Sequence, residues 1–194
     1  MSDNRTRVVI AEDEAIIRLD LKELLEEEGY EVVGETGRGD EAVALVQSLR
    51  PELAILDIKM PGLDGLSAAR QIADERVSAV VILTAFSQRD LVEQARDAGA
   101  LSYLVKPFQK SDLIPALELA LGRHAEIVAL EDEVTDLALR LEARKTVDRA
   151  KGTLMDKHGL SEQDAWRFLQ TNAMSSRAKV HEVAERVLTG DLAP

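Results

Sequence analysis

The sequence predicts a doubly wound α/β domain with a five-stranded parallel sheet, followed by an all-helical segment. Before about residue 122, five short apolar runs alternate with stretches whose apolar residues recur at helical spacing. After about residue 122, strand patterns stop and helical periodicity continues. We therefore expect an α/β domain at residues 1–122, a helical coiled-coil linker at 123–141 and a three-helix domain at 142–194.

The predicted strands are nearly continuous apolar runs, which is typical of parallel strands buried on both faces. They lie at 8–11, 32–33, 53–56, 80–83 and 101–105. The helices between and after them are predicted at 14–28, 40–49, 64–76, 89–98 and from Asp112 onward. Gly29 and Gly99 stand where helices commonly end on a left-handed residue. This alternation indicates helices on both faces of the sheet.

The helix that starts near Asp112 is expected to continue into the second domain, because residues 123–151 contain neither Gly nor Pro. Its predicted end is Gly159. A capping-box pattern at 161–164 then predicts the start of a short helix. A last helix is expected from Ser175 or Ser176, with apolar residues at the spacing of one helix face.

Composition and charge exclude several classes of protein. The 194 residues contain no cysteine, which excludes disulfide scaffolds, cysteine-ligated zinc and thiol catalysis. The longest purely apolar run, 79–83, is too short to span a bilayer, so we expect a cytoplasmic protein without a membrane partner. The net charge of −12 comes mainly from the first domain, whereas residues 140–179 carry nine basic and five acidic side chains. A basic surface is therefore expected on the second domain.

Polar residues follow four of the predicted strands. These are Glu12 and Asp13 after the first strand, Asp57 after the third, Thr84 after the fourth and Lys106 after the fifth. Taken singly, each has an ordinary explanation as a helix cap, a strand residue or a solvated lysine. Because parallel strands place their carboxyl ends at one edge of the sheet, we expect the five side chains to share one site.

Such a site predicts phosphoryl chemistry. Clustered carboxylates repel one another, and oxygen ligands with water suit Mg²⁺. Lys106 and the Thr84 hydroxyl then supply a charge and a donor for phosphoryl oxygens. Asp57 is the candidate nucleophile, which would form an acyl phosphate.

Residues 6–122 resemble the receiver domain of two-component response regulators. The resemblance rests on the stretches 9–14, 56–65, 83–85 and 103–108. It implies a flavodoxin-like sheet of strand order 2-1-3-4-5 and phosphorylation of Asp57 by a sensor histidine kinase. It further implies a cis peptide bond before Pro107.

The same resemblance implies roles for the site residues. Mg²⁺ would be held by Asp13, Asp57 and the backbone carbonyl of Lys59, with Glu12 bound to its waters; Glu12 stands where Asp is commoner. Thr84 and Tyr103 would act as the switch that reports phosphorylation, although Tyr103 also fits a half-exposed strand aromatic.

A seam of apolar residues at alternating spacings of three and four predicts a coiled coil that joins two copies of the chain. Its members are Ile127, Leu130, Val134, Leu137 and Leu141. An amphipathic helix packed within one chain is the alternative. After Leu141 the apolar face rotates by more than about 100° to Ala143, Val147, Ala150 and Leu154, which indicates a second packing partner.

Residues 140–188 resemble the ANTAR domain, an RNA-binding antitermination module of three helices. The matching stretches are 149–152, 154–155, 159–162, 164–166, 173–174 and 183–184, although Trp166 replaces the usual Phe or Tyr and Gln170 a common basic residue. The resemblance implies binding to hairpins in nascent transcripts. The candidate RNA-binding residues are Arg144, Arg149, Lys151, Gly152, Trp166, Arg177 and Lys179, with Trp166 either stacked on a base or buried in the core.

We therefore interpret the chain as a phosphoacceptor regulator, not a metabolic enzyme, with Mg²⁺ as its cofactor and no small-molecule substrate. Its expected partners are a sensor histidine kinase, RNA hairpins and, after phosphorylation, a second copy of itself. The alternatives are a DNA-binding response regulator and a receiver that acts through protein partners only. An aspartyl phosphohydrolase is a further alternative, but Lys59 stands where its second aspartate is needed.

Overall fold

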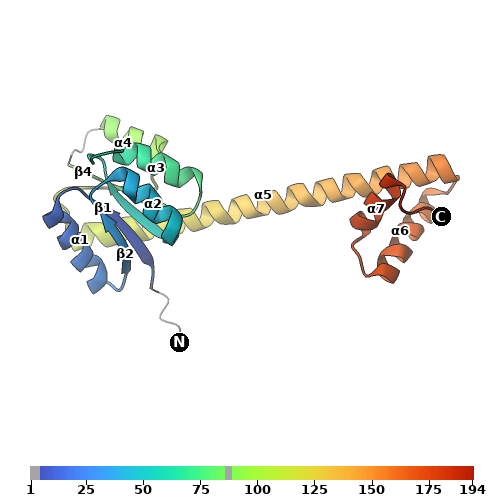
Figure 1. Cartoon of the computed structure of the whole chain (residues 1–194), viewed down its shortest axis with the longest axis horizontal. Coiled ribbons are helices and arrows are strands. Elements are labelled where there is room, and N and C mark those ends of the chain that lie inside the picture. The colour runs from blue at the N-terminus through green and yellow to red at the C-terminus, as the bar shows by residue number, and fades with distance from the viewer. Residues whose placement is uncertain (1–4, 86–88) are drawn as a thin grey trace. The chain divides into compact units, whose positions relative to one another are not determined.

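The structure, a computed structural model, describes residues 5–85 and 89–194 (Figure 1). It divides into two compact units, Met1–Ala129 and Leu130–Pro194, which are described separately below. Helix α5 (Lys110–His158) belongs to both units, as its predicted continuity requires. The three-part division at 122 and 141 stays a prediction.

A five-stranded parallel sheet forms the centre of the first unit. The strands are β1 (Arg7–Ala11), β2 (Glu31–Thr36), β3 (Leu53–Asp57), β4 (Ala79–Thr84) and β5 (Ser102–Val105). Their order is β2-β1-β3-β4-β5, which confirms the predicted topology. Asp57 pairs with Leu83, and Thr84 pairs with Val105, so the carboxyl ends of β3, β4 and β5 lie at one edge.

Helices cover both faces of this sheet, because alternate strand residues point to opposite sides. These helices are α1 (Ala15–Glu27), α2 (Gly39–Leu49), α3 (Gly65–Asp74), α4 (Arg89–Asp97) and the first part of α5. Val8, Ile10 and Ile55 pack on one face against α1 and α5. Val9 and Leu56 pack on the other face against α2 and α3. The apolar strands thus bury both surfaces, as their sequence predicts.

The second unit is a small helical bundle. It contains the end of α5, α6 (Glu162–Ser176) and α7 (Val180–Thr189). Its core consists of Ala150, Leu154, Ala165, Leu169, Ala173, Val183, Ala184 and Val187. Ala150 and Leu154 are therefore the second packing face predicted for α5. The Oγ of Ser161 accepts a hydrogen bond from the Asp164 N–H at 3.1 Å, which caps the start of α6.

The predicted start of the last helix at Ser175 or Ser176 is wrong. Both hydroxyls donate to the carbonyl of Asn172, so these serines form the last turn of α6. Arg177 then ends α6 in the left-handed conformation, with φ of 52°. The N–H of Lys179 donates to Glu182 at 3.0 Å, which fixes the first turn of α7 instead.

The seam predicted on α5 is exposed in the single chain. Leu130, Val134, Leu137 and Leu141 keep 54–65% of their surface exposed, whereas Ile127 is half-buried. Such a row of exposed apolar side chains is unusual on a monomer's surface. Separately, the helices of the described residues include no segment with the length and hydropathy needed to cross a membrane.

Candidate functional site

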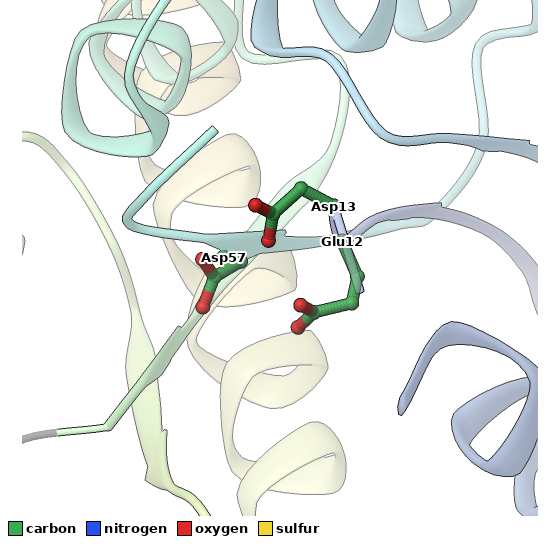
Figure 2. A group of neighbouring side chains, drawn as sticks. All are labelled: Glu12, Asp13 and Asp57. Carbon is green, nitrogen blue, oxygen red and sulfur yellow. The ribbon is translucent and has the colours of Figure 1, made fainter. Parts of the chain in front are cut away.

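Three carboxylates gather at the carboxyl edge of the sheet. Glu12 and Asp13 follow β1, and Asp57 ends β3. One carboxylate oxygen from each lies within 4.8 Å of the others, and Figure 2 shows the three groups around a common space. Glu12 is fully buried and Asp57 is 5% exposed, so their charges need compensation.

Lys106 supplies part of this compensation from the end of β5. Its Nζ lies 2.5 Å from Oε2 of Glu12 and 2.6 Å from Oδ1 of Asp57. Burial lowers the pKa of Lys106, but hydrogen bonds and charge from Asp57 and Glu12 outweigh it and leave the pKa raised. Burial, followed by the charge of Asp57, raises the pKa of Glu12. One ammonium against three carboxylates leaves an excess of negative charge.

This donor set fits a hard divalent cation. The ligands are oxygens, two of the carboxylates are nearly buried, and the cluster carries unbalanced negative charge. A cavity of about 590 Å³ opens beside them and is lined by Asp13, Asp57, Lys59, Thr84 and Lys106, among others. The cavity leaves room for a phosphoryl group as well as an ion.

Backbone contacts fix the position of Asp57. The Lys59 N–H donates to Oδ2 of Asp57 at 2.8 Å, so Oδ1 remains directed to Lys106. A Cβ on Gly65 would lie 1.9 Å from the carbonyl oxygen of Asp57. Only glycine therefore lets the start of α3 approach the end of β3 so closely, a requirement that the sequence pattern did not reveal.

Arg18 is a second residue at this site that the sequence pattern does not reveal. Its Nη1 donates to the carbonyl oxygen of Glu12 at 2.5 Å from within α1, and the Glu14 N–H donates to Oε1 of Glu12 at 3.2 Å. These bonds hold the turn after β1 and direct the Glu12 side chain inward. Arg18 is half-buried on α1, and no sequence signal distinguishes it from the other charged residues of that helix.

The two predicted switch residues lie in different surroundings. Thr84 is buried and lines the cavity beside Asp57. Tyr103 on β5 is 45% exposed and lines a separate cavity of about 340 Å³ with Leu119 and Arg123 of α5. The peptide bond between Lys106 and Pro107 is cis, as the receiver resemblance implies.

The RNA-binding candidates fall into two groups. Arg144, Arg149, Arg177 and Lys179 are exposed. The side chain of Lys151 is only 19% exposed and lies 3.0 Å from Asp148 and 3.1 Å from Glu162. Lys151 therefore joins α5 to α6 before any ligand is bound.

Trp166 and Gly152 complete the set. Trp166 is 40% exposed, while its neighbour Ala165 occupies the core, so the alternative of Trp166 as a core residue is wrong. A Cβ on Gly152 would meet no atom within 4 Å, so packing within the chain does not require a glycine there.

Comparisons with known proteins agree with this arrangement. The response regulator receiver domain family matches residues 8–118, and the ANTAR domain family matches residues 135–188. The chain is 60% identical to Transcriptional regulatory protein PdtaR of Mycobacterium tuberculosis over 182 residues, which cover 94% of this chain and 89% of that protein. It is 38% identical to Chemotaxis protein CheY of Thermotoga maritima over 112 residues, 57% of this chain and 93% of that one.

A solved structure supports the fold of the first unit. The signal receiver domain of NarL from Mycobacterium tuberculosis superposes with a TM-score of 0.58 at 30% identity, over 61% of this chain and 98% of that one. Both domain families are those that the sequence motifs predicted, and neither is a catalytic family. The chain therefore belongs to the two-component response regulators, with a receiver domain followed by an ANTAR domain.

Proposed function

We propose that Asp57 accepts a phosphoryl group from a histidine kinase, and that this event controls binding of the ANTAR domain to RNA hairpins and thereby transcription antitermination. The observation that carries the proposal is the position of Asp57. Its nearly buried carboxylate lies 2.6 Å from Lys106 and shares a cluster with Glu12 and Asp13 at the mouth of a cavity.

The proposed transfer is a displacement at phosphorus. A carboxylate oxygen of Asp57 forms a bond to phosphorus, while the bond between phosphorus and the kinase imidazole nitrogen breaks and its electron pair returns to the ring. Because the Lys59 N–H holds Oδ2, we assign Oδ1 as the attacking atom. Lys106 then moves its contact from Oδ1 to the phosphoryl oxygens, and the Thr84 hydroxyl donates to another of them.

The acidic cluster would hold Mg²⁺ through Asp13, Asp57 and the carbonyl oxygen of Lys59, with Glu12 bound to its waters. When bound, the ion supplies positive charge that offsets the repulsion between carboxylate and phosphate. The residues of the chain hold this geometry in advance, because Lys106, Arg18 and the Lys59 N–H already fix Glu12 and Asp57.

We further propose that the signal leaves the receiver through Thr84 and Tyr103. A shift of Thr84 toward the phosphate would free space for the Tyr103 ring, and Tyr103 already lines a cavity with Leu119 and Arg123 of α5. The same helix carries the exposed seam, so phosphorylation would promote pairing of two seams. A dimer then presents two ANTAR domains to RNA, which raises the apparent affinity for paired hairpins.

The ANTAR domain offers the charge that RNA requires. Arg144, Arg149, Arg177 and Lys179 are exposed and available for phosphate contacts. Hairpin loops expose phosphates and unstacked bases, whereas duplex DNA is read by a helix in a groove. We therefore expect binding to hairpin RNA in preference to duplex DNA.

Two measurements test the proposal. Wild-type protein incubated with labelled acetyl phosphate and Mg²⁺ should acquire one acid- and base-labile phosphate, and Asp57→Asn should acquire none. Asp64→Asn, which changes an exposed aspartate that caps α3, is the matched control and should be labelled normally. Undiminished labelling of Asp57→Asn would disprove the assignment of the phosphoacceptor.

The RNA part is tested by gel shifts of the beryllofluoride-treated protein. The RNA is selected from hairpins with one fixed stem and a randomised loop, and the competitor is duplex DNA of equal length. Preference for the selected hairpins supports the proposal. Equal or stronger binding to the DNA contradicts it and favours a DNA-binding regulator.

A further inference from the structure

A cavity of about 460 Å³ lies within the ANTAR domain, between the end of α5 and the two short helices. Its walls combine an aromatic side chain with cationic groups and apolar side chains. They are formed by Ala143, Arg144, Val147, Asp148, Lys151, Trp166, Val180 and His181. This combination differs from that of the phosphorylation site, and the proposed phosphoryl chemistry does not use it.

The aromatic wall is available to a ligand. Trp166 is the only tryptophan of the sequence and keeps 40% of its surface exposed. Ala165 and Leu169 on the same helix already fill the core, so the indole is not needed to close it. A partly exposed indole at the wall of a cavity offers a flat face on which another ring can stack.

Lys151 and Arg144, the two cationic residues of α5 that line this cavity, have different roles. Lys151 is held by Asp148 at 3.0 Å and by Glu162 at 3.1 Å, and hydrogen bonds to these carboxylates raise its pKa above the ordinary value. Lys151 thus ties the α5 wall to the first turn of α6 and acts as a positioning residue. Arg144 is exposed and has no ion-pair partner within the described part of the chain, so its guanidinium is free to bind an anion.

We infer that this cavity receives one unpaired base of the RNA loop. The base stacks on Trp166, and Arg144 binds an adjoining phosphate. The inference rests on the proposed binding of RNA hairpins and adds the place where a base is read. Single-stranded loops are recognised in this manner, because their unstacked bases can turn outward onto aromatic side chains. Stacking on an aromatic ring tolerates any base, while the cavity walls limit its size.

The single tryptophan gives a direct test with the full chain. The probe is the hairpin selected from the randomised-loop pool, together with a series in which each loop nucleotide in turn is made abasic. The selected hairpin should quench the fluorescence of Trp166, and one abasic hairpin should fail to do so. Unchanged fluorescence at saturating hairpin would overturn the inference.

Affinity measurements provide the second readout. Trp166→Ala should bind the selected hairpin about 5- to 150-fold more weakly, the range expected for loss of one base–aromatic stack. The abasic change that abolishes quenching should weaken binding to the wild-type protein by a similar factor. The same change should cause no further loss of affinity in Trp166→Ala. Additive losses would mean that the base lies elsewhere and would overturn the inference.

Matched variants separate the cavity from general effects. Met174→Ala removes another exposed apolar side chain of α6, outside the cavity, and should bind normally. Arg144→Ala should lose affinity, whereas Lys145→Ala, next to it and paired with Glu142, should lose much less. Equal losses for Arg144→Ala and Lys145→Ala would contradict a specific phosphate contact.

The outcomes also distinguish this inference from the proposed function. Normal hairpin binding by Trp166→Ala would remove the base-binding cavity and leave RNA binding intact. Failure of the wild-type protein to bind any selected hairpin would remove both. If Trp166→Ala fails to fold, the fluorescence quenching of the wild-type protein decides the question. Trp166→Phe then serves as the second variant, because it retains an aromatic ring and should keep most of the affinity.

Discussion

Asp64 shows how one side chain in the receiver domain couples helix formation to pH. Its Oδ1 accepts a hydrogen bond from the Ser67 N–H at 2.9 Å, and its Oδ2 accepts one from the Ser67 hydroxyl at 2.7 Å. The Ser67 hydroxyl and then the Ser67 N–H lower the pKa of Asp64 below 3.8. The ionised carboxylate accepts both bonds more strongly than the neutral carboxyl group does, so acid weakens the cap.

We predict that Asp64→Ala destabilises the protein by about 1 kcal/mol at neutral pH, as loss of a helix cap usually does. Because the folded-state pKa lies below the unfolded value, this contribution is complete above the unfolded pKa. It disappears as the pH falls through the folded pKa. Urea unfolding at a series of pH values should show wild type and variant converging in acid.

Asp74→Ala is the control for this series, since Asp74 is the exposed last residue of the same helix and accepts no capping bond there. It should cause little loss of stability at any pH. A difference between Asp64→Ala and wild type that stayed constant down to strong acid would contradict the proposed role of the carboxylate.

At the residue scale, the sequence predicted chemistry better than geometry. The polar residues at the strand ends pointed to one site because apolar strands make scattered buried charges costly. Gly65 and Arg18 were not found, because their contacts join a side-chain position to the backbone of another element. Such contacts form only where two elements come close together in the fold. The spacing of residues along the chain does not predict which elements do so.

At the scale of elements, glycines in similar helical contexts have opposite roles. A Cβ at Gly65 would lie 1.9 Å from the carbonyl oxygen of Asp57. At Gly122 and Gly152, both within α5, a Cβ would meet no atom within 4 Å. The first glycine is required by packing, whereas the other two lower helix stability without any packing gain.

We predict that Gly65→Ala destabilises the receiver domain by about 1–3 kcal/mol or more, because the start of α3 must move away from β3. The movement also displaces Asp57, so labelling by acetyl phosphate should fall together with the melting temperature. Thermal unfolding and phosphate incorporation measured on the same preparation check the prediction. Normal stability and labelling of this variant would show that the two elements have more freedom than the structure indicates.

We predict the reverse for Gly152→Ala, which should stabilise α5 by about 0.5–1 kcal/mol. If RNA approaches the helix at this position, the added methyl group should weaken hairpin binding while the melting temperature rises. Gly122→Ala is the matched control in the receiver part of α5, where stability should rise and RNA affinity should not change. Unchanged RNA binding by both variants would exclude Gly152 as a contact.

The elements themselves were largely predictable, because short continuous apolar runs alternate with helical apolar patterns in this chain. The exception was the start of α7. Serines are good helix caps, so the sequence favoured Ser175 or Ser176, but their hydroxyls bind back to Asn172 within α6. Helix α6 instead ends at Arg177, a non-glycine residue in the left-handed conformation that the sequence pattern did not predict.

At the scale of the whole molecule, α5 connects packing in the receiver domain with packing in the ANTAR domain. Leu113 and Leu117 are buried against the sheet, while Ala150 and Leu154 are buried in the helical core. Between these positions the seam residues are mainly exposed. The sequence predicted this succession of packing faces, because its apolar residues move to another side of the helix after Leu141. The partner that covers the seam stays a proposal.

We predict that Val134→Glu combined with Leu137→Glu prevents beryllofluoride from promoting a dimer. Burial of each such apolar side chain contributes about 1.5–3 kcal/mol, so the Kd for dimerisation should rise at least a hundredfold on this estimate. Sedimentation equilibrium with and without beryllofluoride measures the change. Leu139→Glu, equally exposed but outside the seam, should leave the dimer intact. A monomeric wild type under both conditions would contradict phosphorylation-promoted pairing.

The unbroken course of α5 also limits how these two domains can be exchanged among regulators. Residues 119–134, between the two family matches, are entirely helical, so a fusion there joins helix to helix and not loop to loop. Each residue inserted or deleted turns everything after it by about 100° about the helix axis. Recombination between related genes would therefore preserve signalling only when the exchanged length restores the angular phase, as an insertion of about seven residues does.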